Sequence, residues 1–398
     1  MDTLSLPTPN PPGARRGWLH SRVRFALAIV LIAGCGGGSS SGSKSGTPPP
    51  NQHVATPGIA TAPAQNGAVI VTLSDTTSGA AIYYTLDGSM PTSSSTEYFA
   101  PFLVASNVTL NAIATAPPLL NSSAASKTFS ANIASGTLVW SDEFANNSAG
   151  NVSPDAATWT YDTGTDCCGN NELETYCAYG SNTPPCSTST PNAYVGTDGY
   201  LHIVAMSPTP NVYTSARLKS QGLFAFQYGR IEARMQLPES QGMWPAFWML
   251  GSNITAVPWP ACGEADIMEH IDGANPPFSA GATPPGYDWI AGSVHGGASA
   301  SAEVNGSQRY SPTGFSAAAW HTYGMIWSKG QIEYYVDSPS NVYATFNTGN
   351  FGGTWPFDQG PMFIILNLAV GGDWPGNPDS TTVFPSNMLV DYVRIYTN

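Results

Sequence analysis

Residues 263–270 read Gly-Glu-Ala-Asp-Ile-Met-Glu-His and place three carboxylates, Glu264, Asp266 and Glu269, within six positions of an apolar run. Side chains of a strand alternate between its two faces, so Glu264 and Asp266 share one face while Glu269 points to the other. A β-bulge around residues 267–268 would set two residues opposite one on the neighbouring strand and return Glu269 to the shared face. The stretch therefore predicts a bulged β-strand with three acids in one row.

The row of acids indicates a particular chemistry. Three carboxyl groups this close cannot all ionise easily, so we expect one to stay protonated while another is anionic. A retaining glycosidase needs that pairing, with a nucleophile and an acid roughly 5 to 5.5 Å apart on either side of the scissile bond. An acidic edge strand is the alternative. It is disfavoured because Trp244, Trp248 and Trp259 crowd the same region and charged residues make up only 10% of the chain.

At this motif the chain resembles glycoside hydrolase family 16, in the branch of laminarinases and other endo-β-1,3-glucanases. Further segments resemble the family and follow its order from residue 138 to the C-terminus, so a chance match to all of them is implausible. These segments are 138–144, 169–173, 214–218, 228–234, 242–250, 320–323, 365–372 and 391–396.

The residues and the resemblance together suggest a role for each acid. We expect Glu264 to attack the anomeric carbon and form a covalent glycosyl-enzyme. Glu269 would protonate the departing oxygen and then deprotonate the incoming water, which suits a carboxyl whose pKa is raised by neighbouring negative charge. Asp266 lies between them and would share a proton or a hydrogen bond with Glu264.

Five further residues are candidates for substrate binding. Trp244 and Trp248 lie four residues apart and therefore on one face of a strand, where a sugar ring could stack, although a place in the core is as common for such residues. The resemblance places Asn170, Arg217 and His295 in or near the cleft, where they could bind sugar hydroxyls. Taken alone, His295 would more often be structural.

The resemblance also implies a structural calcium in many relatives. Glu143 and Asp391 occupy the corresponding places here, and oxygen ligands suit this ion, but two carboxylates do not define a site. The chemistry itself requires no cofactor. Zinc is disfavoured because the sequence has no paired CxxC spacing and few histidines.

The N-terminus resembles a bacterial lipoprotein signal. Four arginines precede an apolar run that ends in Leu31-Ile32-Ala33-Gly34-Cys35, which resembles a lipobox, and the run is too short to span a membrane. Cleavage before Cys35 and acylation of its thiol would tether an exported lipoprotein to a membrane, at the cell surface or on the periplasmic face. Residues 1–35 are then the signal peptide and lipobox, and 36–55 a Gly/Ser/Pro-rich linker.

Five cysteines remain besides Cys35. In an oxidising exterior they suggest up to two disulfides and one odd thiol. Cys177 with Cys186 would close the Pro-rich loop between them. Cys262 with either Cys167 or Cys168 would join two segments that form the cleft. The sequence alone leaves the pairing open.

Two folded parts are expected, both all-β. Residues 56–133 contain short β-branched or aromatic runs separated by turn formers, which predicts a small Ig-like β-sandwich. Its segment 82–92 resembles the C-terminal domain of chitobiase and β-hexosaminidase. Nothing in it looks catalytic, so we interpret it as a spacer or accessory module. Its aromatic residues could form a sugar-stacking face, although a core role is commoner; they are Tyr83, Tyr84, Tyr98 and Phe99.

Residues 138–398 have strand-like stretches at short intervals and almost no helical periodicity, which predicts a large antiparallel β-sandwich or jelly roll. The family resemblance implies the same fold, with a concave sheet forming an open cleft, and an open cleft would permit attack inside a polysaccharide chain.

The charge of the chain limits the classes of partner and substrate that it can bind. A net charge of -13 argues against nucleic acid and anionic surfaces. Residues 138–398 hold only seven lysines and arginines, whereas binding of a sulfated galactan would need more of them.

We therefore expect a monomeric, retaining endo-β-1,3-glucanase acting on a neutral, laminarin-like β-glucan. The alternatives are a mixed-linkage β-1,3-1,4-glucanase, another neutral β-glycan hydrolase or transglycosylase, and a non-catalytic glycan-binding lipoprotein, which the intact acids disfavour.

Overall fold

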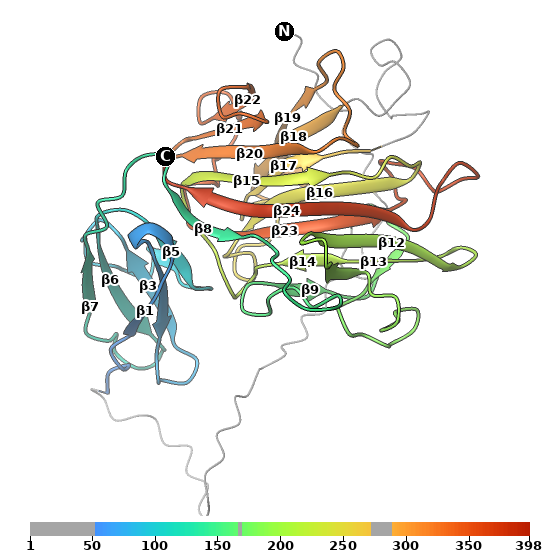
Figure 1. The fold of residues 1–398 in the computed structure, drawn as a ribbon. Coiled ribbons are helices and arrows are strands. Elements are labelled where there is room, and N and C mark those ends of the chain that lie inside the picture. The colour runs from blue at the N-terminus through green and yellow to red at the C-terminus, as the bar shows by residue number, and fades with distance from the viewer. Residues whose placement is uncertain (1–51, 166–168, 272–288) are drawn as a thin grey trace, which may run out of the picture.

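The computed structural model describes residues 52–165, 169–271 and 289–398, which form two β-sandwiches (Figure 1). The predicted signal peptide with Cys35, most of the linker, and Cys167 and Cys168 lie outside these residues. In the described ranges, no helix is long and apolar enough to cross a membrane.

The smaller sandwich is the N-terminal module, and it confirms the predicted small β-sandwich. Its core includes Val71, Leu110 and the stacked pair Tyr84 and Phe102, whose ring centroids lie 4.7 Å apart. Tyr84 is therefore a core residue and not a sugar platform. One sheet has the order β1 (Gly58–Pro63), β2 (Val69–Ser74), β5 (Phe102–Val104), and the other β4 (Thr96–Glu97), β3 (Ala81–Thr85), β6 (Val108–Thr115), β7 (Ala125–Phe129).

The larger sandwich consists of a ten-stranded and a seven-stranded sheet, as the predicted jelly roll requires. The ten-stranded sheet runs β10 (Glu174–Tyr176), β13 (Val212–Ser215), β12 (Leu201–Thr209), β24 (Ser386–Tyr396), β15 (Gly229–Gln236), β20 (His321–Ser328), β21 (Gln331–Val336), β22 (Val342–Asn347), with β11 (Ala193–Val195) beside β12 and β8 (Leu138–Asp142) beside β24. The seven-stranded sheet runs β19 (Glu303–Tyr310), β18 (Ile290–Gly297), β17 (Glu264–Glu269), β16 (Met243–Gly251), β23 (Met362–Val370), β14 (Arg217–Lys219), β9 (Thr160–Asp162).

The core lies between these two sheets. Alternate residues of each strand point into it, for example Ile231 and Met235 of β15 and Phe247 and Met249 of β16, all of them without exposed surface. Full burial of a side chain of this size stabilises the fold by about 1.5 to 3 kcal/mol. The residues between them face away from the core, so the outer face of the seven-stranded sheet can carry polar groups.

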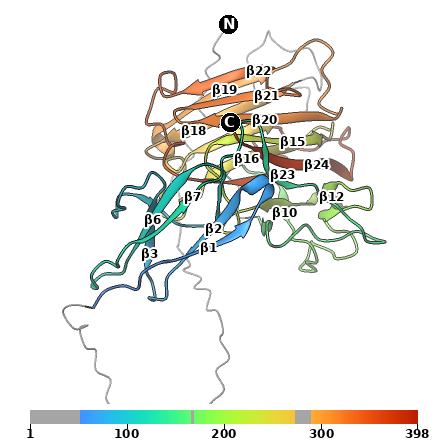
Figure 2. The same ribbon diagram turned by 60° about the vertical axis from the view of Figure 1, so that its left-hand side comes forward.

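The N-terminal module is fixed to the larger sandwich by main-chain pairing. Leu103 of β5 donates to the Ala225 carbonyl at 3.0 Å, and the Ala225 amide donates to the Pro101 carbonyl at 2.9 Å. The side chain of Ala68 belongs to the large hydrophobic core, and Gln65 Nε2 donates to Ser141 Oγ at 2.9 Å. Figure 2 shows the module against one side of the larger sandwich. Shared backbone and core contacts indicate a docked module, not one on a free tether.

The cysteines confirm one expected disulfide and exclude the other. Cys177 and Cys186 are bonded, with their Cα atoms 5.7 Å apart. The expected bridge from Cys262 is wrong, because Cys262 is a free thiol that is 3% exposed and packs with Leu250 and Phe363. Burial raises the pKa of this thiol to about 12, so it stays protonated.

Candidate active site

The bulge in β17 is confirmed by the register of β16 against it. Asp266 lies opposite Trp248 and Met268 lies opposite Phe247, so Ile267 is the extra residue that β16 leaves without a partner. Glu264 and Glu269 lie opposite Leu250 and Ala246. Since 246, 248 and 250 share one face of β16, the three acids share the outer face of the sheet, while Ala265 and Met268 enter the core.

His295 of β18 connects the acids to a fourth carboxylate. It lies opposite Glu264, and its Nε2 is 3.1 Å from Asp266 Oδ2 and 4.0 Å from Glu264 Oε1. Its Nδ1 is 2.6 Å from Oε1 of Glu303, at the start of β19. The imidazole, rather than the carboxyl of Glu264, is therefore the partner of Asp266.

Glu264, Asp266 and His295 are also the described residues closest to a metal-binding arrangement, with one ligand atom of each within 4.8 Å of the others. Ion pairing between the imidazole and the carboxylates accounts for this grouping, and we assign no metal to it.

Trp244 holds the third acid. Its indole Nε1 donates to Glu269 Oε1 at 3.0 Å, and the ring of Trp374 lies edge-on to it with centroids 5.1 Å apart. A tryptophan N–H needs a partner when it is partly buried, so this bond orients the Glu269 carboxyl as well as satisfying the indole. Trp244 thus contacts the acid directly, whether or not it also stacks on a sugar.

Trp248 is held between two polar groups. Its Nε1 donates to Asn367 Oδ1 at 2.7 Å, and the Arg217 guanidinium carbon lies 4.5 Å over its ring. Arg217 is paired in turn with Asp162 of β9, with Nε 3.1 Å from Oδ2. One face of the Trp248 ring is therefore covered by a cation, which leaves at most the other face for a sugar.

Asn170 lies in an exposed loop and bonds to its own neighbours. Its amide N–H donates to Glu172 Oε2 at 2.9 Å, and its carbonyl accepts from the Asp373 amide at 2.7 Å. The second bond ties the loop to Asp373, which follows β23. In the described part of the chain Asn170 has no hydrogen bond to the three acids.

The protonation of the acids follows from burial and from each other. Burial raises the pKa of Glu264, and the charge of Asp266 raises it further, while His295 and Arg217 partly offset both. Burial also raises the pKa of Glu269 well above its ordinary value, with Asp266 adding to the shift. For His295, burial opposes protonation, but Asp266 and Glu303 outweigh it and raise its pKa.

The arrangement separates the roles of the two outer acids. His295 lowers the raised pKa of both outer acids, whereas Arg217 lowers that of Glu264, which favours the anionic form of Glu264. Glu269 accepts a hydrogen bond from the Trp244 indole, and burial together with the charges of Asp266 and Glu264 outweighs that bond and His295, so its pKa stays well above the ordinary value. An anionic nucleophile and a protonated acid on one face are what glycoside cleavage with retention needs.

The two residues expected at a calcium site each have a cationic partner. Glu143 accepts two bonds from Arg394, at 2.9 and 2.7 Å, and Asp391 Oδ2 lies 2.7 Å from Arg234 Nη1. Carboxylates neutralised in this way do not fit a calcium site as arranged. The calcium stays a prediction from the resemblance.

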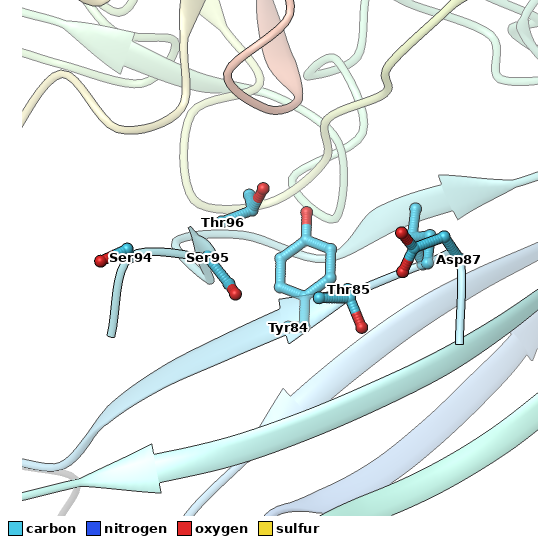
Figure 3. A pocket seen from close by; sticks show the side chains of 7 residues that line it. Tyr84, Thr85, Asp87, Ser94, Ser95 and Thr96 are labelled. Atoms are coloured by element: carbon cyan, nitrogen blue, oxygen red, sulfur yellow. The ribbon is translucent and has the colours of Figure 1, made fainter. Parts of the chain in front are cut away.

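A pocket lies in the N-terminal module (Figure 3). The hydroxyls of Ser94, Ser95 and Thr96 and the carboxylate of Asp87 line it. Tyr84 also lines it, but its ring stacks on Phe102 and is 3% exposed, so the pocket presents no free aromatic face for a sugar.

Sequence reasoning missed several residues that the structure brings to the site. Asn367 lies within the family-like segment 365–372 and Trp374 lies just beyond it, so that segment was a usable signal. Asp162 and Glu303 belong to no motif, and only the strand order places them beside Arg217 and His295.

Comparison with known proteins gives two family matches. The sequence model for glycosyl hydrolases family 16 matches residues 185–393, and that for the chitobiase/β-hexosaminidase C-terminal domain matches residues 61–128. A β-glucanase of Rhodothermus marinus is 36% identical over 273 residues, which are 65% of this chain and 84% of that protein.

Solved structures agree with these matches. The endo-β-1,3-glucanase of Pyrococcus furiosus is 39% identical, with a TM-score of 0.53, over 66% of this chain and 94% of that one. The laminarinase catalytic domain of Thermotoga maritima is 35% identical, with a TM-score of 0.53, over 67% of this chain and 99% of that one.

Proposed function

Since the chain belongs to glycosyl hydrolase family 16, we propose that it is an endo-acting enzyme that hydrolyses β-1,3-glucan with retention of anomeric configuration. The observation that carries the proposal is the bulged strand β17, which puts Glu264, Asp266 and Glu269 in one row beside His295. Similar proteins support the substrate, since those of Pyrococcus furiosus and Thermotoga maritima are an endo-β-1,3-glucanase and a laminarinase.

In the proposed reaction Glu264 attacks the anomeric carbon while the bond from that carbon to the leaving sugar breaks. Glu269 gives its proton to the departing oxygen, and a glycosyl ester of Glu264 remains. Water then attacks the anomeric carbon, Glu269 takes a proton from that water, and the bond from the carbon to Glu264 breaks, so that Glu264 leaves as a carboxylate. Trp244 keeps the Glu269 carboxyl oriented through both steps.

The first prediction is that residues 52–398, produced as a soluble protein, release short oligosaccharides from laminarin. The earliest product should be the β-anomer, seen by proton NMR before it mutarotates, because two inversions at one carbon give retention. Endo action predicts a rapid fall in polymer length before much reducing sugar appears.

A panel of substrates distinguishes the alternatives. Mixed-linkage β-1,3-1,4-glucan and a sulfated galactan should be assayed beside laminarin at equal concentration. Preferential cleavage of mixed-linkage glucan would replace the β-1,3-glucanase proposal with its closest alternative. Binding to laminarin without any cleavage of the panel would leave a glycan-binding protein.

We also propose that the protein is exported and anchored by lipid on Cys35. The apolar run and lipobox-like sequence before Cys35 support this. Expressed in a bacterium, the full chain should then be found in the membrane fraction and take up labelled fatty acid, and Cys35→Ser should do neither. Labelling that persists in Cys35→Ser would contradict the proposal.

A further inference from the structure

Glu303 is an acid that the reaction scheme does not use. It begins β19, at the edge of the seven-stranded sheet, directly after a short 3-10 turn, Ala300–Ala302. Its Oε1 lies 2.6 Å from His295 Nδ1 and accepts from Asn305 Nδ2 at 2.9 Å. Its side chain is 23% exposed. Burial alone therefore does not explain why a charged residue occupies this position.

The ring of His295 lies between two carboxylates. Nδ1 faces Glu303 and Nε2 faces Asp266, at 2.6 and 3.1 Å. A neutral imidazole has one donor and one acceptor nitrogen, whereas an imidazolium donates from both. Because ionised carboxylates only accept, the geometry at both nitrogens fits the imidazolium.

We propose that Glu303 is a positioning residue for glucan hydrolysis. It fixes the ring of His295 with Nε2 toward Asp266 and keeps the ring protonated, so that a positive charge lies beside Glu264 when that carboxyl must be anionic. The inference rests on the proposed function, because it gives Glu264 the role of nucleophile.

The charges around His295 decide what loss of Glu303 does. Glu264 and Asp266 face the ring from β17 and Glu303 faces it from β19, while Arg217 of β14 acts on Glu264. Burial lowers the pKa of His295, so with one carboxylate gone the ring should lose its proton at lower pH. The neutral ring no longer holds down the pKa of Glu264, which then rises.

If Glu303 acted only as a nearby negative charge, its removal would shift the pKa of Glu264 in the opposite direction. If His295 stayed protonated without Glu303, removal of one negative charge would lower the pKa of Glu264. The direction of the shift therefore separates a positioning role from general electrostatics.

The test that needs no activity is NMR of the soluble chain with ¹³C-labelled histidine. The signal of His295 is assigned by its absence in His295→Asn. In the wild type it should titrate above the ordinary range, and in Glu303→Gln its midpoint should fall by about one pH unit or more. Glu303→Asp keeps the charge on a shorter side chain and should lie between them. Equal midpoints in wild type and Glu303→Gln would overturn the proposal.

The functional test is the pH profile of kcat/KM on laminarin. In Glu303→Gln the acidic limb should move up by about one pH unit, because Glu264 must lose its proton to react. Glu97→Gln removes the same charge from β4 of the N-terminal module, outside the sandwich that carries His295, and should leave the limb unchanged. A limb that stays, or that moves down, would overturn the positioning role. An inactive wild type would instead refute the proposed function and leave the NMR result to decide on Glu303.

Discussion

Glu264→Gln is expected to lower kcat on laminarin by about 10⁴- to 10⁶-fold, since no other group can form the glycosyl-enzyme. The amide has nearly the shape of the carboxyl but carries no charge and is a poor nucleophile. KM should change little, because the substitution removes an interaction made during the reaction and not in binding. Single-turnover kinetics on a soluble β-1,3-glucan oligosaccharide measure the effect without interference from product release.

Reaction with azide tests whether Glu264 is the nucleophile. In Glu264→Ala a small anion can occupy the space of the lost carboxylate and attack the sugar carbon directly from that side. A single inversion then gives an α-glycosyl azide, with partial recovery of the rate. Thermal unfolding should show that both variants remain folded. A Glu264→Gln enzyme with a tenth or more of wild-type kcat would show that another residue is the nucleophile.

Glu269→Ala is expected to lower kcat/KM on laminarin by about 10²- to 10⁴-fold, the usual contribution of a general acid. On a dinitrophenyl glycoside the first step should be almost unaffected, because that leaving group departs without a proton. Here azide should react with the glycosyl-enzyme and give a β-glycosyl azide, the product of two inversions. An equal loss on both substrates, or an α-azide, would contradict the assignment.

The same variant tests the pH behaviour of the acid. Burial and the charge of Asp266 raise the pKa of Glu269, so its carboxyl stays protonated at pH values where an ordinary glutamate, with a pKa of about 4.3, has ionised. Wild-type activity should therefore fall only as pH rises through this raised pKa. Glu269→Ala lacks the group and should lose the decline on the dinitrophenyl substrate. A decline that persists would belong to another residue.

The bulge in β17 shows why much of the site could be predicted. Strand parity is a local property, so the spacing of Glu264, Asp266 and Glu269 allowed one extra residue to be placed near 267–268, and Ile267 is that residue. The two sandwiches follow from the same local periodicity of apolar residues. The bond between Cys177 and Cys186 also spans a short loop, and it was expected from the sequence.

Contacts with residues distant in the sequence could not be predicted in this way. Cys262 was expected to pair across the cleft, yet it packs with apolar side chains that come from β16 and β23. Trp248 stays a predicted sugar platform, and the sequence did not indicate that Arg217 would lie over one face of its ring. The partners in these cases lie outside the immediate sequence neighbourhood, from Leu250, 12 residues before Cys262, to Phe363 on β23, and no local pattern specifies which of them meet.

The sequence by itself thus determined the all-β class, the bulged strand and the face that carries Glu264, Asp266 and Glu269, because alternation and bulges depend on neighbouring residues. Only the tertiary structure decided how those carboxyls are charged. Strand order brings His295, Glu303 and Arg217 beside them from β18, β19 and β14. Burial and charge act through space. They raise the pKa of both Glu264 and Glu269, while Arg217 lowers that of Glu264 and the bond from Trp244 lowers that of Glu269, so two identical side chains acquire different surroundings.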